Sequence, residues 1–281
     1  MFCEIEKIHP NVTRIWDVSR TAMYLVEGSD AAALIDTGVG VGSLKTVVES
    51  ITDKPVVVLL THGHVDHAMG AGEFDKVYMN SADRPIYAEH SLFQVRQGYV
   101  SGAAMTGGNP ELIASVKETD FIPAFDAACF HELRSDDKFD LGGVSVEVLD
   151  APGHTPGSMV MLIPELRMLL LGDACNAFTY LFDKSCPTVA EYKETLLKLK
   201  AKVDGKFDRT LYSHGIGEGA FDMMDRVIAV CDDIMEGRVD NVPFRGFSGE
   251  PVCIAKAMDF QRFGRADGGE GNIVYDPNKI R

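Results

Sequence analysis

The order of the predicted elements indicates an α/β fold in which two sheets pack together and helices lie outside them. Strands, a helix and a further strand come first along the 281-residue chain, and a second set of strands with two helices follows. Apolar runs such as Met168–Leu171 are far shorter than the roughly 20 residues that a membrane-spanning helix needs. With 46% hydrophobic and 25% charged residues, the composition is that of an ordinary globular protein.

Short runs of apolar and β-branched residues predict the first half of this fold. They predict strands over residues 12–18, 22–27 and 32–35, a helix over 43–50, and a buried strand over Val56–Leu60. We expect these elements to form the first sheet and a helix that covers it.

A second set of strands begins near residue 144. Val144, Val146 and Val148 alternate with more polar neighbours, which is the period of a β-strand. Further strands are predicted at Met159–Ile163, Met168–Leu171 and Arg209–Ser213.

Two longer helices have signals of their own. Thr188 and Glu191 have the spacing of a capping box and follow Pro187, so a helix is predicted to begin there. Apolar residues then recur every three or four positions, as on the buried face of a helix. These residues are Tyr192, Leu196, Leu199 and Val203 in the first helix, and Phe221, Met224, Ile228, Cys231 and Met235 in the second. We interpret both faces as core packing rather than as a cofactor surface.

The charge of the chain argues against a nucleic-acid partner. It has 42 acidic residues against 27 Lys and Arg, a formal net charge of −15, whereas proteins that bind phosphate backbones present a basic surface.

The N-terminus has no apolar core of signal-peptide length, and the six cysteines form no CxxC pair. We therefore expect a cytoplasmic protein with a small-molecule substrate and no nucleic-acid or membrane partner; homodimer formation stays open.

Three imidazoles and a carboxylate lie within the run Thr61–His67, directly after a predicted strand. Such groups are the ligands that borderline divalent ions such as zinc prefer. Residues two apart in an extended stretch point the same way, so His62 and His64 can bind one ion together. If a helix begins next, Asp66 and His67 project towards a second ion. Solvated loop histidines are the alternative, but clustered imidazoles repel one another when protonated and need a cation beside them.

Three more residues of the metal-binding type follow predicted strands. His154, Asp173 and His214 each lie next to a glycine at the carboxyl end of one of these strands. Loops that leave one edge of a sheet can converge on a common point. Alone, each residue would be an ordinary turn residue; together with the first run, we predict that all three are metal ligands.

This combination of motifs resembles the metallo-β-lactamase superfamily, whose HxHxDH motif is followed by a distant His, an Asp and a final His. The resemblance covers the chain from about residue 12 to 217, and it implies an αββα sandwich of two mixed sheets with outer helices. It also implies that His62, His64 and His154 bind a first metal, that Asp66, His67 and His214 bind a second, and that Asp173 bridges both. Asp36 matches a position that supports the site, although a turn-forming Asp before Gly38 is an equally good interpretation.

The resemblance implies hydrolysis at two divalent ions. Two cations that share a water lower its pKa towards neutrality, so that a metal-bound hydroxide can attack a carbonyl or phosphoryl group that the same ions polarise. Asp66 or Asp173 would act catalytically by carrying a proton to the leaving group. Zinc is the expected metal, with manganese or iron as alternatives because the ligand set has no thiolate. Cys175 lies near Asp173, but we interpret it as a packed thiol.

Differences from individual branches of the superfamily narrow the range of expected substrates. The β-lactamases lack the bridging Asp173, and flavodiiron reductases have a Glu in place of His64, so the full set resembles the glyoxalase II, lactonase and nuclease branches. Lactonases place a Tyr soon after the bridging Asp, whereas Asn176 and Phe178 precede Tyr180 here. We predict a hydrolase of a small ester, thioester or lactone. The alternatives are a phosphodiesterase or ribonuclease of the same superfamily, a mononuclear-iron sulfur dioxygenase, and a metal-binding protein without enzymatic activity.

We expect a single domain over residues 1–281, with a largely helical insertion at about 80–139 and a C-terminal extension at about 240–281. The centre of the insertion, Gln97–Gly108, is rich in glycine next to apolar side chains. This composition suits a lid over a small substrate, and a plain surface excursion is the equally supported alternative. Ten acidic and five basic residues between Asn80 and Asp140 make the insertion a poor surface for RNA.

Overall fold

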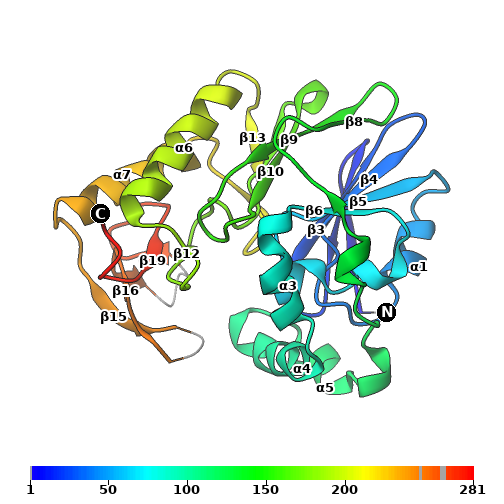
Figure 1. Ribbon diagram of the computed structural model, residues 1–281, viewed down its shortest axis with the longest axis horizontal. Coiled ribbons are helices and arrows are strands. Elements are labelled where there is room, and N and C mark those ends of the chain that lie inside the picture. Colours follow the sequence, from blue (N-terminus) through cyan, green and yellow to red (C-terminus); the bar gives the residue numbers. More distant parts are fainter. Residues whose placement is uncertain (1, 247–248, 260–263) are drawn as a thin grey trace.

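Two mixed sheets pack face to face in the structure, with helices on both outer sides (Figure 1). The structure, a computed structural model, describes residues 2–246, 249–259 and 264–281. The predicted αββα sandwich is therefore confirmed. In the described part of the chain, no helix combines the length and the apolar character that a membrane span requires.

The first sheet has seven strands in the order of the sequence. Its first four strands are antiparallel neighbours, and the last four run parallel. The strands predicted at 22–27 and 32–35 have these same bounds, whereas the first, sixth and seventh strands were not predicted. The strands are β1 (Glu4–His9), β2 (Val12–Trp16), β3 (Ala22–Glu27), β4 (Ala32–Ile35), β5 (Val56–Leu59), β6 (Val77–Met79) and β7 (His131–Glu132).

The second sheet has six strands, and every predicted strand of the second set lies in it. Its strands pair antiparallel except for one parallel pair, β11 with β13. In spatial order the strands are β14 (Glu218–Gly219), β13 (Arg209–Leu211), β11 (Met168–Leu170), β10 (Met159–Ile163), β9 (Ser145–Asp150) and β8 (Lys138–Asp140).

The main core lies between the two sheets, and strand β10 shows how the sequence builds it. Met159, Met161 and Ile163 face the first sheet, while Val160 and Leu162 face the helices on the other side. All five side chains are buried because the strand is covered on both faces. Each of these side chains contributes roughly 1.5–3 kcal/mol when it leaves water.

The helices cover the outer faces of both sheets. α6 (Val189–Val203) and α7 (Met223–Met235) lie on the second sheet, and α6 begins with the predicted capping box: Thr188 Oγ1 accepts from the Glu191 N–H, and Glu191 accepts from the Thr188 N–H. The predicted core position Phe221 was wrong, because this residue precedes α7 and is 66% exposed. On the outer face of the first sheet, α1 (Leu44–Glu49), α2 (Val65–Ala68) and α3 (Arg84–His90) contribute buried side chains to the core. α4 (Phe93–Gly102) packs next to α2 and α3, and α5 (Pro110–Ser115) lies beside α4 (Figure 1).

Helical elements follow one another through the insertion from Ser81 to Cys129. Short 3-10 helices connect α3, α4 and α5 and lead on to residue 129. Its last part is not helical: residues 131–132 form β7 and residues 138–140 form β8, which extend the two sheets. The 3-10 helices of this region are Ser81–Asp83, Ala103–Thr106, Glu118–Asp120 and Ala127–Cys129.

The C-terminal extension builds a small sheet of its own beside the second sheet. Its strands β15 (Val242–Arg245), β16 (Pro251–Ile254) and β19 (Ile273–Tyr275) join β12 (Thr179–Leu181), which follows the Asp173 loop. This small sheet therefore fixes the segment that leaves the candidate site. Two further short strands, Met258–Asp259 and Gly264–Arg265, pair with each other.

Candidate metal centre

All seven predicted metal ligands come together at one edge of the sandwich. They follow the carboxyl ends of β5, β9, β11 and β13, as the predicted strand ends required. Five of the residues are no more than 7% exposed, and His214 has the most exposed side chain of the seven, at 37%. The cluster is therefore buried on most sides and opens to solvent beside His214. Its members form three overlapping groups that could hold a metal ion: His62, His64 and His154; His62, His67 and Asp173; and Asp66, His67 and His214.

Hydrogen bonds fix the tautomers of two histidines in the first group. His62 Nδ1 lies 3.0 Å from Thr61 Oγ1, and because that hydroxyl donates to Asp36, it accepts the proton of His62. His154 Nδ1 donates to the Tyr180 carbonyl oxygen at 2.8 Å. In each ring the other nitrogen, Nε2, is then left with a free lone pair. His62 Nε2 is buried and has no hydrogen-bond partner.

The nitrogen atoms of this first group converge. His64 Nδ1 lies 3.0 Å from His154 Nε2, and the other ring nitrogen of His64 faces Asp183 at 3.8 Å. When the ring proton of His64 is on Nε2, the nitrogen that faces Asp183, its Nδ1 presents a lone pair beside that of His154. A separation of about 3 Å between two such nitrogens suits neighbouring ligands of one ion, because zinc–nitrogen bonds are about 2.0–2.1 Å long. The first group therefore presents three nitrogen ligands to one point.

Asp36 orients His67 of the second group through a hydrogen bond, so the predicted supporting contact of Asp36 is present. Its carboxylate accepts from His67 Nδ1 at 2.8 Å and from the Thr61 N–H and hydroxyl at 2.7 Å each. Asp36 is 1% exposed and has a left-handed backbone conformation with φ 63°, which Asp tolerates better than most residues. His67 Nε2, held by this bond, is buried without a hydrogen-bond partner and faces the cluster.

Asp173 lies at the centre of the second group. Its Oδ2 is 3.0 Å from His214 Nε2, 3.4 Å from His67 Nε2 and 3.8 Å from His154 Nε2. One carboxylate oxygen thus reaches nitrogen atoms of both groups. Asp66 Oδ2 completes the arrangement at 3.3 Å from His214 Nε2.

The two groups differ in their electrostatics. Burial lowers the pKa of His62 and His64 well below the ordinary value of 6.5, and neighbouring imidazoles add to the effect. Burial alone would also lower the pKa of His67, but Asp66 and the carboxylates beside it outweigh burial and raise this pKa well above 6.5. Burial would raise the pKa of Asp173, but His214 and His67 lower it well below its ordinary value. Neutral imidazoles therefore dominate one group and carboxylates the other, a donor set that fits divalent cations.

Asp83 supports the loops of the site, and the sequence prediction missed it. Its carboxylate accepts from the Gly63 N–H, the Gly157 N–H and the Thr155 hydroxyl at 2.6–2.8 Å, so it joins the loop of His62 and His64 to the loop of His154. A Cβ atom added at Gly157 would lie 2.7 Å from Asp83 Oδ1, which explains the glycine there. A weak signal exists, since Asp83 also follows a strand, but β6 has only three residues and was not predicted.

The insertion contributes two further residues next to the ligands. The Tyr99 hydroxyl of α4 donates to Asp66 Oδ2 at 2.7 Å, and the Thr21 hydroxyl lies 3.2 Å from the same oxygen. His90 of α3 stacks on His64 with ring centroids 4.9 Å apart and accepts from the Val65 N–H.

Cys175 is buried in the core under α6, which confirms its interpretation as a packed thiol.

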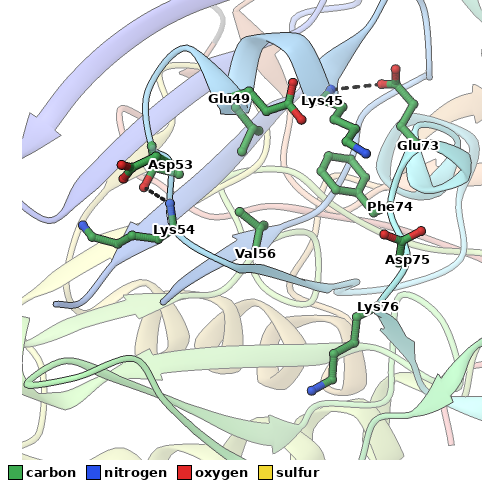
Figure 2. Close-up of a pocket in the computed structure, with 11 residues that line it drawn as sticks. Lys45, Glu49, Asp53, Lys54, Val56, Glu73, Phe74, Asp75 and Lys76 are labelled. Carbon is green, nitrogen blue, oxygen red and sulfur yellow. Dashed lines mark hydrogen bonds between the residues drawn. The ribbon is translucent and has the colours of Figure 1, made fainter. Parts of the chain in front are cut away.

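A separate groove lies around α1, at the start of β5 rather than at its carboxyl end (Figure 2). Its volume is about 430 Å³, and none of the seven cluster residues lines it. Figure 2 shows Lys45 next to Glu73, whose carboxylate accepts from the Lys45 N–H at 3.1 Å. Lysines and acids alternate along this groove, so it has no strong charge of one sign.

Comparison with known proteins establishes the family. A sequence profile of the metallo-beta-lactamase superfamily matches residues 16–214, which is well over half of the chain and includes all seven cluster residues. The chain belongs to this superfamily. Solved structures of the superfamily agree in fold: a metallo-beta-lactamase from Pontibacter korlensis is similar with a TM-score of 0.58 and 18% identity, covering 81% of this chain and 97% of that one.

Two relatives among curated proteins illustrate the range of the superfamily. An uncharacterized protein of Mycobacterium tuberculosis is 32% identical over 147 residues, which are 48% of this chain and 56% of that protein. The matched part thus spans little more than half the length of that relative. Human acyl-coenzyme A thioesterase MBLAC2 is 24% identical over 221 residues, covering 70% of this chain and 73% of that protein.

Proposed function

We propose that this member of the metallo-β-lactamase superfamily is a hydrolase with a dinuclear metal centre. The observation that carries the proposal is the pair of buried imidazole nitrogens, His62 Nε2 and His67 Nε2, that have no hydrogen-bond partner. Leaving buried polar atoms unpaired costs about 1–3 kcal/mol each. A bound cation removes this cost: it accepts the lone pair of His62 Nε2, and at His67 Nε2 it takes the place of the proton that the neighbouring carboxylates favour in the metal-free protein.

The distances support an assignment of the ligands to two ions. We assign His62, His64 and His154 to one ion, because their free nitrogens converge. Asp66, His67 and His214 would hold the other ion, and Asp173, whose Oδ2 lies near nitrogen atoms of both groups, would serve both ions. Zinc is the preferred metal for such a set, and manganese or iron would also accept it.

Such ions, when bound, acidify a water molecule and polarise the carbonyl group of a substrate. The protein residues orient this chemistry. Thr61 and Asp36 fix the imidazole tautomers, Asp66 or Asp173 carries a proton to the leaving group, and the exposed side of His214 gives the substrate a route from solvent.

The proposed substrate is a small-molecule ester, thioester or lactone. The name of the human relative, an acyl-coenzyme A thioesterase, supports the thioester in particular. The net charge of −15 disfavours a nucleic-acid substrate, so we propose neither a nuclease activity nor a nucleic-acid partner.

A substrate screen combined with metal analysis tests this proposal. Purified protein is assayed against acyl thioesters, lactones and phosphodiesters, with His64→Ala and Asp173→Ala as site variants and Asp53→Ala, on the exposed rim of the α1 groove, as the matched control. We expect hydrolysis of a thioester or lactone, two metal ions per chain, and loss of activity in both site variants only. Full activity of the site variants would overturn the assigned site, and one iron per chain with oxygen uptake would replace hydrolysis by oxidation.

A further inference from the structure

Tyr99 connects the helical insertion to the metal centre. It lies on α4, inside the glycine-rich segment Gln97–Gly108, for which the sequence supported a lid and a plain surface excursion equally. Its hydroxyl donates to Asp66 Oδ2 at 2.7 Å. This is the oxygen that lies 3.3 Å from His214 Nε2 and 3.6 Å from His67 Nε2, so Tyr99 contacts the carboxylate on its ligand side.

The helix that carries Tyr99 is anchored by a buried arginine one turn earlier. Arg96 is 3% exposed, and its guanidinium donates to the carbonyl oxygens of Ile122 at 2.6 Å and Gly40 at 2.9 Å. Residues three apart on a helix lie on the same face, so Arg96 and Tyr99 both point away from solvent, towards the loop after β4 and towards Asp66. Gly40 has φ 67°, and a Cβ atom there would lie 2.3 Å from the Met69 carbonyl oxygen and 2.6 Å from the guanidinium, so the loop after β4 needs glycine at this close approach.

Asp66 is therefore held by two separate parts of the chain. Thr21, in the loop between β2 and β3, reaches Asp66 Oδ2 at 3.2 Å, and this loop is in turn fixed by Asp17, which accepts from the Thr21 N–H at 3.0 Å. The second support is Tyr99, and it comes from the insertion rather than from the sandwich. The position of one metal ligand thus depends on how α4 docks.

We propose that Tyr99 is a positioning residue that holds Asp66 in the orientation needed to bind the second ion, and that ion binding and docking of α4 are coupled through this hydrogen bond. The inference rests on the dinuclear centre proposed above. Partners that orient a metal ligand from outside typically change metal affinity by roughly 10–100-fold when they are removed. Coupling is reciprocal, so an ion that favours the docked helix must also stabilise it.

A titration with zinc tests this inference. Zinc is added to metal-free wild-type protein, to Tyr99→Phe and to Tyr87→Phe, in competition with a chromophoric chelator. Tyr87 is the matched control, because its hydroxyl also makes one hydrogen bond inside the insertion, to the Phe125 carbonyl oxygen at 3.0 Å, but not to a cluster residue. We expect Tyr99→Phe to bind the first ion normally and the second roughly 10–100-fold more weakly, and Tyr87→Phe to bind both like wild type.

Hydrogen exchange gives a second readout that does not depend on activity. Zinc should slow amide exchange in α4 of the wild-type protein, and this protection should disappear in Tyr99→Phe. Two ions bound with unchanged affinity in Tyr99→Phe, or an equal loss in Tyr87→Phe, would overturn the inference alone. A wild-type chain that binds fewer than two ions would overturn the dinuclear centre and this inference with it.

Discussion

Replacement of Asp36 by Asn should weaken metal binding without changing the shape of the site. Asn has nearly the size of Asp and also tolerates the left-handed backbone conformation, with φ 63°, found here. One carboxylate oxygen must become an NH2 group, however. Asp36 accepts three hydrogen bonds, from the Thr61 N–H, the Thr61 hydroxyl and His67 Nδ1, and it donates none.

Either orientation of the new amide is harmful. If the NH2 group faces the Thr61 N–H, two donors meet in a buried place, at a cost of about 1–3 kcal/mol. If it faces His67 Nδ1, it donates to that nitrogen and shifts the ring proton to Nε2, the atom that faces the cluster. A protonated nitrogen cannot bind a metal ion. We expect the affinity for the ion at His67 to fall roughly 10–100-fold, or about 1.4–2.7 kcal/mol.

The assay is a competition titration with zinc on wild type, Asp36→Asn and Asp53→Asn. Asp53 is exposed on the α1 groove, so its variant controls for the loss of one negative charge. Unchanged affinity in Asp36→Asn would refute the reasoning that this carboxylate sets the tautomer of His67.

Four other outcomes are expected. Leu196 is on the buried face of α6, so Leu196→Ala should lower the free energy of unfolding by about 2–5 kcal/mol in a denaturant titration. Leu197, its neighbour on the same helix, is exposed, so Leu197→Ala should change this free energy by less than about 0.5 kcal/mol. Equal effects of the two substitutions would contradict the described packing. Asp83→Ala should leave the Gly63 and Gly157 N–H groups unpaired and lower the melting temperature of the metal-free protein, and an unchanged value would show that the loops do not depend on Asp83. Removal of metal by a chelator should lower the melting temperature reversibly, since an ion at 1,000 times its Kd stabilises by about 4 kcal/mol; no change would argue against metal binding. Burial would lower the pKa of His214, but Asp173 raises it above 6.5, so a proton must leave before the ion binds; zinc affinity should rise with pH above 6.5, and a flat profile would contradict this.

The sequence predicted the sandwich and the cluster for the same reason. Long periodic or uninterrupted apolar runs, such as β10 and the buried face of α6, can be recognised in the sequence whatever the helix or strand propensity of the individual residues. Because ligands at strand ends depend only on those strands, the convergence of His154 and Asp173 on the first motif could be expected before any contact was known.

The supporting residues could not be predicted in this way. Tyr99 and Asp83 reach the site through the insertion, whose helices are short and whose docking depends on single buried contacts such as that of Arg96. Strands of two or three residues, among them β6 and β7, carry too little pattern to recognise and are defined by their neighbours in the sheet. Contacts between distant parts of the chain, and not local sequence pattern, determine these short strands and the positions of Tyr99 and Asp83.

The metal content of the wild-type chain tests the central claim most directly. Native mass spectrometry of the protein loaded with zinc, compared with the same protein after chelation, counts the ions bound per chain. Two ions are expected, with the second lost in Asp66→Ala and the overall fold kept. A chain that binds one ion or none under these conditions would contradict the assignment of the seven residues to a dinuclear centre.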